Sequence, residues 1–175
     1  MKIYKPTSAG RRDATVIEYK KYLSSNRSQP VKALTKGKRS TGGRNSQGRT
    51  TQLYRGGGNK RTYRMIDFSY NKKNIEARIE TIEYDPNRTG FIACVLYKDG
   101  ERRYILVPQT LAVGDTFIVS DEARPKVGNR LPLGKIPAGT KIYAVELKPS
   151  RGARHARTAG NYAEEGGQDG AFSLR

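Results

Sequence analysis

Three clusters with basic residues lie within the first 64 residues of the chain. In the first two, at residues 41–49 and 54–61, glycine alternates with cations, and the third, at 62–64, follows with Tyr63 and Arg64. Because glycine has no Cβ atom and tolerates positive φ, the backbone there can turn sharply and lie close to another polymer. Arginine forms paired hydrogen bonds with phosphate groups and can also stack on a base. This chemistry predicts a binding surface for a polyphosphate chain.

Two tyrosines, Tyr54 and Tyr63, are interleaved with these clusters. Their rings can receive unstacked bases, which folded RNA presents in its loops and bulges. A DNA-binding protein would instead show a helix-turn-helix or zinc-finger pattern for reading the major groove, and the sequence contains neither. RNA is therefore the expected partner, in preference to DNA.

The positive charge is concentrated near the N-terminus. The chain has 175 residues and a formal net charge of +18. Residues 1–64 hold 17 Lys and Arg against 2 Asp and Glu, residues 65–147 hold 12 against 11, and residues 148–175 hold 5 against 3. Such a basic segment favours a polyanion, most commonly nucleic acid. An anionic membrane would require an amphipathic basic helix or a lipid anchor, and neither is evident, so no membrane partner is expected.

The segment from Ser24 to Arg64 is too poor in apolar side chains to fold alone. Its isolated apolar residues bury too little surface to offset the entropy lost on ordering. We expect residues 1–64 to form an extended basic arm that RNA orders, with its last part able to join the following domain. A solvated linker is the alternative, although linkers seldom carry about one cation per four residues with almost no acid.

From Met65 onward, short apolar runs alternate with turn signals. We expect strands at 78–84, 91–97, 102–107, 116–119 and 141–147. Asp85-Pro86 begins a turn after the first strand, and Lys98-Asp99-Gly100 supplies hairpin chemistry after the second. No long helical periodicity is present. The spacing of the strands predicts an all-β chain that contains a small barrel.

The residues needed for catalysis are scarce. His155 is the only histidine, and Cys94, the only cysteine, lies in an apolar run typical of a core strand. No Cys/His spacing suits zinc, and residues 56–61 lack the Gly-Lys-Ser/Thr order of a nucleotide-binding loop. Asp85 is expected to stabilise its turn rather than act as a base. We expect no enzyme activity, and the lone cysteine favours a reducing compartment.

Several stretches along the chain match one known family when they are read in order. They are residues 5–12, 42–45 with 48–49, 56–60, 63–68, 83–88, 96–106, 147–149 and 156–160. In these stretches the chain resembles the N-terminal portion of the second protein of the large ribosomal subunit, the "L-two" family of bacteria and organelles. The resemblance implies an OB-fold barrel at 65–122, followed by an SH3-like barrel at 123–175. Both barrels would pack on large-subunit rRNA, with the arm threaded between rRNA helices.

The resemblance also implies which residues contact rRNA. In the arm they are Arg11, Arg12, Arg44, Asn45, Arg49, Lys60, Arg61 and Arg64. Tyr54 and Tyr63, which are expected from the chemistry of their rings to receive bases, are added to this set. The loop 148–157 looks like a second contact surface, for which a solvated barrel edge is the alternative. It contributes Arg151, Arg154, His155 and Arg157. No cofactor is expected beyond structural Mg²⁺ that accompanies rRNA.

Family members of ordinary length continue beyond residue 175, so the second barrel is expected to be incomplete in this chain. We expect a second polypeptide to supply the remainder, as in organelles where this gene is split. A longer chain of which this is one part is the alternative. The expected location is the ribosome of a mitochondrial matrix or another organelle, with the bacterial cytoplasm as the other candidate.

The expected function is that of a structural constituent of the ribosome. It would bind large-subunit rRNA beside neighbouring ribosomal proteins and support subunit assembly for translation. The alternative is a free OB-fold module that binds single-stranded RNA outside the ribosome. Such a module would place cations and stacking aromatics on the barrel face, whereas residues 65–147 are nearly neutral.

Overall fold

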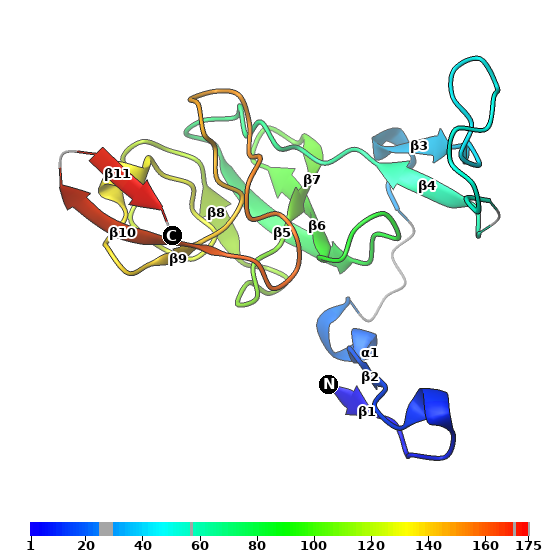
Figure 1. Cartoon of the computed structure of the whole chain (residues 1–175). Helices are drawn as coiled ribbons and strands as arrows, with labels where there is room; N and C mark the ends of the chain where they lie inside the picture. Colours follow the sequence, from blue (N-terminus) through cyan, green and yellow to red (C-terminus); the bar gives the residue numbers. More distant parts are fainter. Residues whose placement is uncertain (25–29, 57, 170, 175) are drawn as a thin grey trace.

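The computed structural model describes residues 1–24, 30–56, 58–169 and 171–174, and strands dominate this part of the chain (Figure 1). The strands are β1 (Lys2–Ile3), β2 (Thr15–Val16), β3 (Thr35–Lys38), β4 (Arg61–Arg64), β5 (Glu76–Glu83), β6 (Ile92–Tyr97), β7 (Arg102–Leu106), β8 (Thr116–Ile118), β9 (Lys141–Ile142), β10 (Ala163–Asp169) and β11 (Ala171–Leu174). The described helices are α1 (Tyr19–Tyr22) and the 3₁₀ turns Ala9–Arg11, Lys32–Leu34 and Leu133–Lys135. The all-β class expected from the sequence is confirmed.

The central sheet has the strand order β7-β6-β5-β8, and every neighbouring pair is antiparallel. The register between β5 and β6 shifts between Ile79 and Thr81. A bulge of this kind increases the local twist, which helps a sheet to curl. Gly100 has φ +86 in the tight turn between β6 and β7, where the sequence predicted a hairpin. The closure of this sheet into an OB-fold barrel stays a prediction.

Both faces of β6 are buried, which explains its continuous apolar run. Ala93, Val95 and Tyr97 belong to the larger core cluster, while Ile92 and Cys94 belong to a smaller one. Successive side chains of a strand point to opposite faces of the sheet, so each cluster receives alternate residues. Every position of such a strand must therefore be apolar.

The basic segment covers the smaller core cluster. That cluster consists of Ile92, Cys94, Tyr104 and Leu106. Val31 and Leu34 pack against it, and the N–H of Met65 donates a hydrogen bond of 2.9 Å to the carbonyl of Leu34. Strands β3 and β4 pair as an antiparallel ribbon beside this contact (Figure 1). The segment from Ser24 to Arg64, which was expected to be extended, thus contains a docked ribbon, because two isolated apolar residues find partners in the distant core.

The C-terminal part contains a three-stranded sheet with the order β11-β10-β9. The prediction of a strand over 141–147 is wrong beyond Ile142, where β9 ends. Ala144 has φ +52, which breaks the pleat, and its N–H donates to the carbonyl of Ala156 at 3.0 Å. Val145 then pairs with His155 in an isolated bridge. No helix in the described parts of the chain is long and apolar enough to cross a membrane.

Candidate nucleic-acid interface

The loop 41–55 between β3 and β4 is organised around the carbonyl of Gly43. This carbonyl accepts hydrogen bonds from the backbone N–H groups of Thr51 at 2.9 Å and Gln52 at 3.1 Å. Gly43 has φ +76, and a Cβ atom at this position would lie only 2.4 Å from the carbonyl oxygen of Gln52. Glycine is therefore required here both by the backbone conformation and by the space available.

Asn45 forms the second organising point of the loop. Its Oδ1 atom accepts hydrogen bonds of 3.0 Å from the backbone N–H groups of Gln47 and Arg49. Its own N–H donates to the carbonyl of Arg49 at 3.0 Å. An asparagine side chain that bonds its own backbone in this way stabilises a turn. The structure thus uses Asn45, a predicted rRNA contact, to hold the exposed Arg44 and Arg49 on either side of one turn.

The far end of the loop presents an apolar pair to solvent. Leu53 is 76% exposed, and Tyr54 is fully exposed with φ +57. The adjacent Arg55 donates a hydrogen bond of 2.7 Å from its guanidinium to the side-chain oxygen of Gln52. The ring of Tyr54 can accept a stacked base, as the sequence predicted, because nothing in the described parts of the chain covers it.

The β3–β4 ribbon adds cations that the sequence prediction did not include. Lys36 lies opposite Tyr63, and Lys38 lies opposite Arg61. Cross-strand neighbours are close in space, so Lys36 and Lys38 join the basic surface of β4. Their role could have been found only from the strand pairing, because neither lies in a glycine-rich cluster. Lys60 is also exposed, directly before β4.

Arg64, the last predicted contact of the arm, is placed differently from the others. It is only 8% exposed, and its guanidinium lies 3.8 Å from the Asp85 carboxylate. Asp85 is fully buried and also accepts hydrogen bonds from Arg88 at 2.6 Å and from the N–H of Asn87 at 2.9 Å. Burial acts to raise the pKa of Asp85, but the hydrogen bonds from Arg88 and Asn87 outweigh it and hold the pKa below its ordinary value. Arg64 therefore joins the ribbon to the turn at 85–88.

Several cations on and around the central sheet are paired with carboxylates, whereas those of residues 30–61 are not. Sheet-side ion pairs include Lys98–Glu76 at 2.7 Å, Arg102–Glu80 at 2.7 Å, Arg103–Asp67 at 2.7 Å and Arg130–Glu146 at 2.6 Å. Hydrogen bonds from Arg102 lower the pKa of Glu80. Within the described residues from 30 to 64, Arg64 alone forms an ion pair. The exposed cations of that segment are thus available to an external anion.

The second predicted surface, the loop 148–157, is anchored to the segment that follows β4. The N–H of Ala153 donates to the carbonyl of Phe68 at 2.7 Å, and Gly152, at φ +79, lies so close that a Cβ atom there would be 3.0 Å from the same oxygen. The guanidinium of Arg157 lies over the Phe68 ring at 4.7 Å. The predicted residues of this loop are all exposed: Arg151, Arg154, His155 and Arg157.

The structure does not bring every predicted residue together. Arg11 lies over the ring of Tyr4 at 5.6 Å, and Arg12 follows the 3₁₀ turn Ala9–Arg11. Among the described residues, neither arginine forms a hydrogen bond, an ion pair or a ring contact with the loop 41–55 or with the loop 148–157. Both arginines are exposed. Their rRNA contact stays a prediction.

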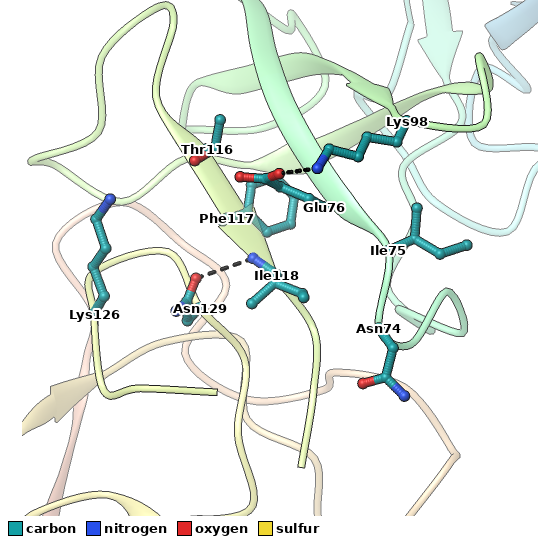
Figure 2. Close-up of a pocket in the computed structure, with 9 residues that line it drawn as sticks. All are labelled: Asn74, Ile75, Glu76, Lys98, Thr116, Phe117, Ile118, Lys126 and Asn129. Atoms are coloured by element: carbon teal, nitrogen blue, oxygen red, sulfur yellow. Dashed lines mark hydrogen bonds and ion pairs between the residues drawn. The ribbon is translucent and has the colours of Figure 1, made fainter. Parts of the chain in front are cut away.

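Figure 2 shows a groove beside β5 and β8, in which the side chains of Glu76 and Lys98 point toward each other. Hydrogen bonds from Lys98 and Thr116 lower the pKa of Glu76, so this carboxylate stays ionised. Asn129 accepts a hydrogen bond from the N–H of Ile118 at 3.0 Å. The one carboxylate of the groove is therefore held ionised by its ion pair, which is unlike a group that is poised for acid–base chemistry.

Cys94 has the environment of a core residue. It is 2% exposed, and burial raises the pKa of its thiol to about 11. A thiol in this state is not the reactive thiolate at neutral pH. In the described parts of the chain, no group of three or more His, Cys, Asp or Glu side chains is arranged to hold a metal ion.

Two family models match the chain. The model of the RNA-binding N-terminal domain of ribosomal proteins L2 matches residues 31–120, and the model of their C-terminal domain matches residues 126–173. The large ribosomal subunit protein uL2 of Roseobacter denitrificans is 49% identical over 173 residues, which cover 99% of this chain and 61% of the relative.

Two further relatives carry the same printed name. The uL2 protein of Hyphomonas neptunium is 49% identical over 173 residues, covering 99% of this chain and 62% of the relative. That of Rhodopseudomonas palustris is 48% identical over 169 residues, covering 97% and 60%. The chain thus spans about three fifths of the length of these curated relatives. The resemblance noted in the sequence is confirmed, and the chain belongs to the ribosomal protein L2 family.

Proposed function

We propose that this chain is a structural component of the large ribosomal subunit that binds large-subunit rRNA and supports subunit folding and assembly for translation. The observation that carries the proposal is the contrast between the unpaired cations of residues 30–61 and the ion pairs that several cations form on and around the central sheet. Exposed cations repel one another unless an anion neutralises them, and a phosphate backbone does so at many points. Membership of the L2 family supports the same partner.

The proposed rRNA surface has two parts. The first comprises the loop 41–55 and the β3–β4 ribbon, with Arg44, Arg49, Lys60 and Arg61 as phosphate contacts and Tyr54 as a stacking ring. The second is the loop 148–157. Asn45 and Arg64 position the first part through the turn and the Asp85 contact, and structural Mg²⁺ would belong to the rRNA.

We keep the expected division into a basic arm at 1–64, an OB-fold barrel at 65–122 and an SH3-like barrel at 123–175. The family models support a boundary between residues 120 and 126. The first model begins at residue 31, which agrees with the docking of Val31 and Leu34 on the smaller core cluster. The latter part of the arm is thus proposed to belong to the first barrel.

Beyond rRNA, the proposed partners are neighbouring ribosomal proteins. The part of the family's sequence that this chain does not span would be carried either by this polypeptide or by a second one. The second barrel would be completed by that part. Mass spectrometry of purified ribosomes distinguishes the two cases, because one continuous polypeptide covering both halves excludes a second chain. The proposed compartment is an organelle such as the mitochondrial matrix, and the genome that encodes the chain tests this against a bacterial cytoplasm.

Sedimentation of a tagged chain through a sucrose gradient tests the proposed function. The chain is expected to migrate with large subunits at salt concentrations that release weakly bound proteins, and ultraviolet crosslinking is expected to join the peptides containing Arg44 and Arg61 to large-subunit rRNA. The control variant Arg102→Gln should migrate and crosslink as the wild-type chain does, because that guanidinium is already paired with Glu80. Migration with free protein, or crosslinks to messenger RNA only, would contradict the proposal and favour the free RNA-binding module.

A further inference from the structure

Four aromatic residues form a half-exposed cluster away from the glycine-rich loops. Tyr19 and Tyr22 come from α1, Tyr84 follows β5, and Phe91 precedes β6. The ring of Tyr19 meets Tyr84 edge-on with centroids 5.4 Å apart, and the ring of Tyr22 stacks on Phe91 with centroids 6.2 Å apart and an angle of 29° between the planes. Tyr19, Tyr22 and Tyr84 are 45%, 48% and 47% exposed.

The cluster is held in place by backbone contacts that follow α1. The N–H of Ser24 donates to the carbonyl of Ile82 at 3.2 Å, and the N–H of Ile82 donates to the hydroxyl of Ser24 at 2.9 Å. Leu23 packs against the larger core cluster. A helix of only four residues gains its stability from such tertiary contacts rather than from its own hydrogen bonds. The rings are therefore positioned before any partner arrives.

The chemistry of this surface fits a nucleobase. The Tyr22 ring stacks against Phe91 on one side, and Tyr22 is 48% exposed, so part of the residue is accessible to a further flat ring. Lys20 and Lys21 are exposed on the same helix, and Glu18, the nearby acid, is paired with Lys21 at 3.8 Å. Aromatic rings beside free cations bind single-stranded RNA by stacking on bases while the cations contact phosphates.

We propose that Tyr22, supported by Tyr19, Tyr84 and Phe91, forms a stacking platform for an unstacked RNA base. The platform rests on the proposed function, because it takes the same polymer at a place separate from the glycine-rich loops. Partly exposed aromatic rings on a strongly basic chain suit the bases of that polymer as stacking partners. Lys20 neutralises the adjacent phosphate.

The test compares two RNA probes with equal numbers of phosphates: a single-stranded uridine oligonucleotide, and the same oligonucleotide with abasic riboses. The wild-type chain is expected to bind the uridine probe more tightly. In the variant Tyr19→Leu/Tyr22→Leu, this preference is expected to fall by about 5- to 100-fold, the range for the loss of one base–aromatic stack. Tyr22→Phe keeps the ring and should retain the preference. Tyr162→Leu is the matched control, because Tyr162 is 55% exposed but its ring lies under Lys141.

The outcomes distinguish a failure of the platform alone from a failure of the proposed function. A wild-type chain that binds neither probe defeats the proposed function and the platform with it. Equal binding of both probes, or an unchanged preference in the double variant, refutes the platform and leaves phosphate binding intact. If the double variant does not fold, photocrosslinking of a 5-iodouridine probe to the wild-type chain decides: adducts on Tyr22 support the platform, and their absence refutes it. A crosslink from Tyr22 to a ribosomal protein in assembled subunits also refutes it.

Discussion

The hydroxyl of Tyr104 donates a hydrogen bond of 3.0 Å to the buried carboxylate of Glu83. The same hydroxyl accepts a hydrogen bond of 3.0 Å from the backbone N–H of Val31. Burial raises the pKa of Tyr104, so the hydroxyl keeps its proton and remains a donor at neutral pH. One core side chain thus links the central sheet to the beginning of the segment that carries the unpaired cations.

Tyr104→Phe removes this link and is expected to lower the free energy of unfolding by about 1–3 kcal/mol, because the N–H of Val31 and the carboxylate of Glu83 each lose a partner. Urea unfolding followed by circular dichroism measures the change. Tyr97→Phe is the control, because the Tyr97 hydroxyl is buried without a hydrogen-bond partner in the described structure. Its removal should change the free energy by less than about 0.5 kcal/mol. Equal losses in the two variants would contradict the role of the hydroxyl of Tyr104.

The Asp85 carboxylate predicts a pH dependence of stability. Its pKa in the folded chain lies below the ordinary value of 3.8, so the ionised form stabilises the fold above that value, and this stabilisation is lost as the pH falls through the lower pKa. Asp85→Asn is expected to cost roughly 3–5 kcal/mol at pH 7, because it leaves Arg88 and Arg64 without a counter-ion. The difference between wild type and variant should shrink between about pH 5 and pH 2.

Urea unfolding at pH 7 and pH 3 measures this difference. Asp121→Asn is the control, because that carboxylate is 65% exposed and lies 3.4 Å from Lys73, whose side chain is 59% exposed. The control should cost less than about 1 kcal/mol at both pH values. A difference between wild type and Asp85→Asn that is the same at pH 7 and pH 3 would contradict the assigned state of Asp85.

The central sheet could be predicted from the sequence because its signals are local. The run from Phe91 to Tyr97 is apolar at every position since both faces of β6 are buried, and the turn at Lys98-Asp99-Gly100 carries its own conformational preference. The pairing of β3 with β4 could not be predicted. Those strands are rich in Lys, Arg and Thr, and their position depends on contacts of Val31 and Leu34 with residues far away in sequence.

The sequence suggested which residues make up the candidate site but not how they are arranged. The glycine-rich clusters predicted Arg44, Arg49 and Arg61 as rRNA contacts by residue type, because cations between glycines suit a phosphate backbone, and these contacts stay predictions. The structural roles of Asn45 and Arg64 depend on hydrogen bonds and on burial, which residue type does not reveal. The aromatic cluster around Tyr22 was missed because its members come from α1 and from the ends of two strands.

The conformation of Gly43 predicts that the loop 41–55 loses its folded conformation when this position carries a side chain. Gly43→Ala adds backbone strain of about 1–2 kcal/mol at positive φ and places a Cβ atom against the carbonyl of Gln52. RNA affinity, measured by filter binding, should therefore fall by about tenfold or more, with little change in the unfolding of the central sheet.

Gly48→Ala provides the comparison for this loop. Gly48 has φ +80, but a Cβ atom there would meet no atom within 4 Å. This variant carries the backbone strain without the collision, so it should weaken RNA binding less than Gly43→Ala does. A loss of affinity that is equal in the two variants would show that the Gly43–Gln52 contact does not organise the loop.

The dependence of RNA affinity on salt tests the central claim, that unpaired cations of the basic segment bind the rRNA backbone. If about 6–10 phosphates are engaged, the affinity of the wild-type chain should fall roughly 10³–10⁵-fold between 50 and 200 mM salt. Replacing Arg44, Arg49, Lys60 and Arg61 by Gln should make the slope of log affinity against log salt shallower by about 3, whereas Arg102→Gln should leave it unchanged. Parallel lines for the wild type and the fourfold variant would contradict the claim.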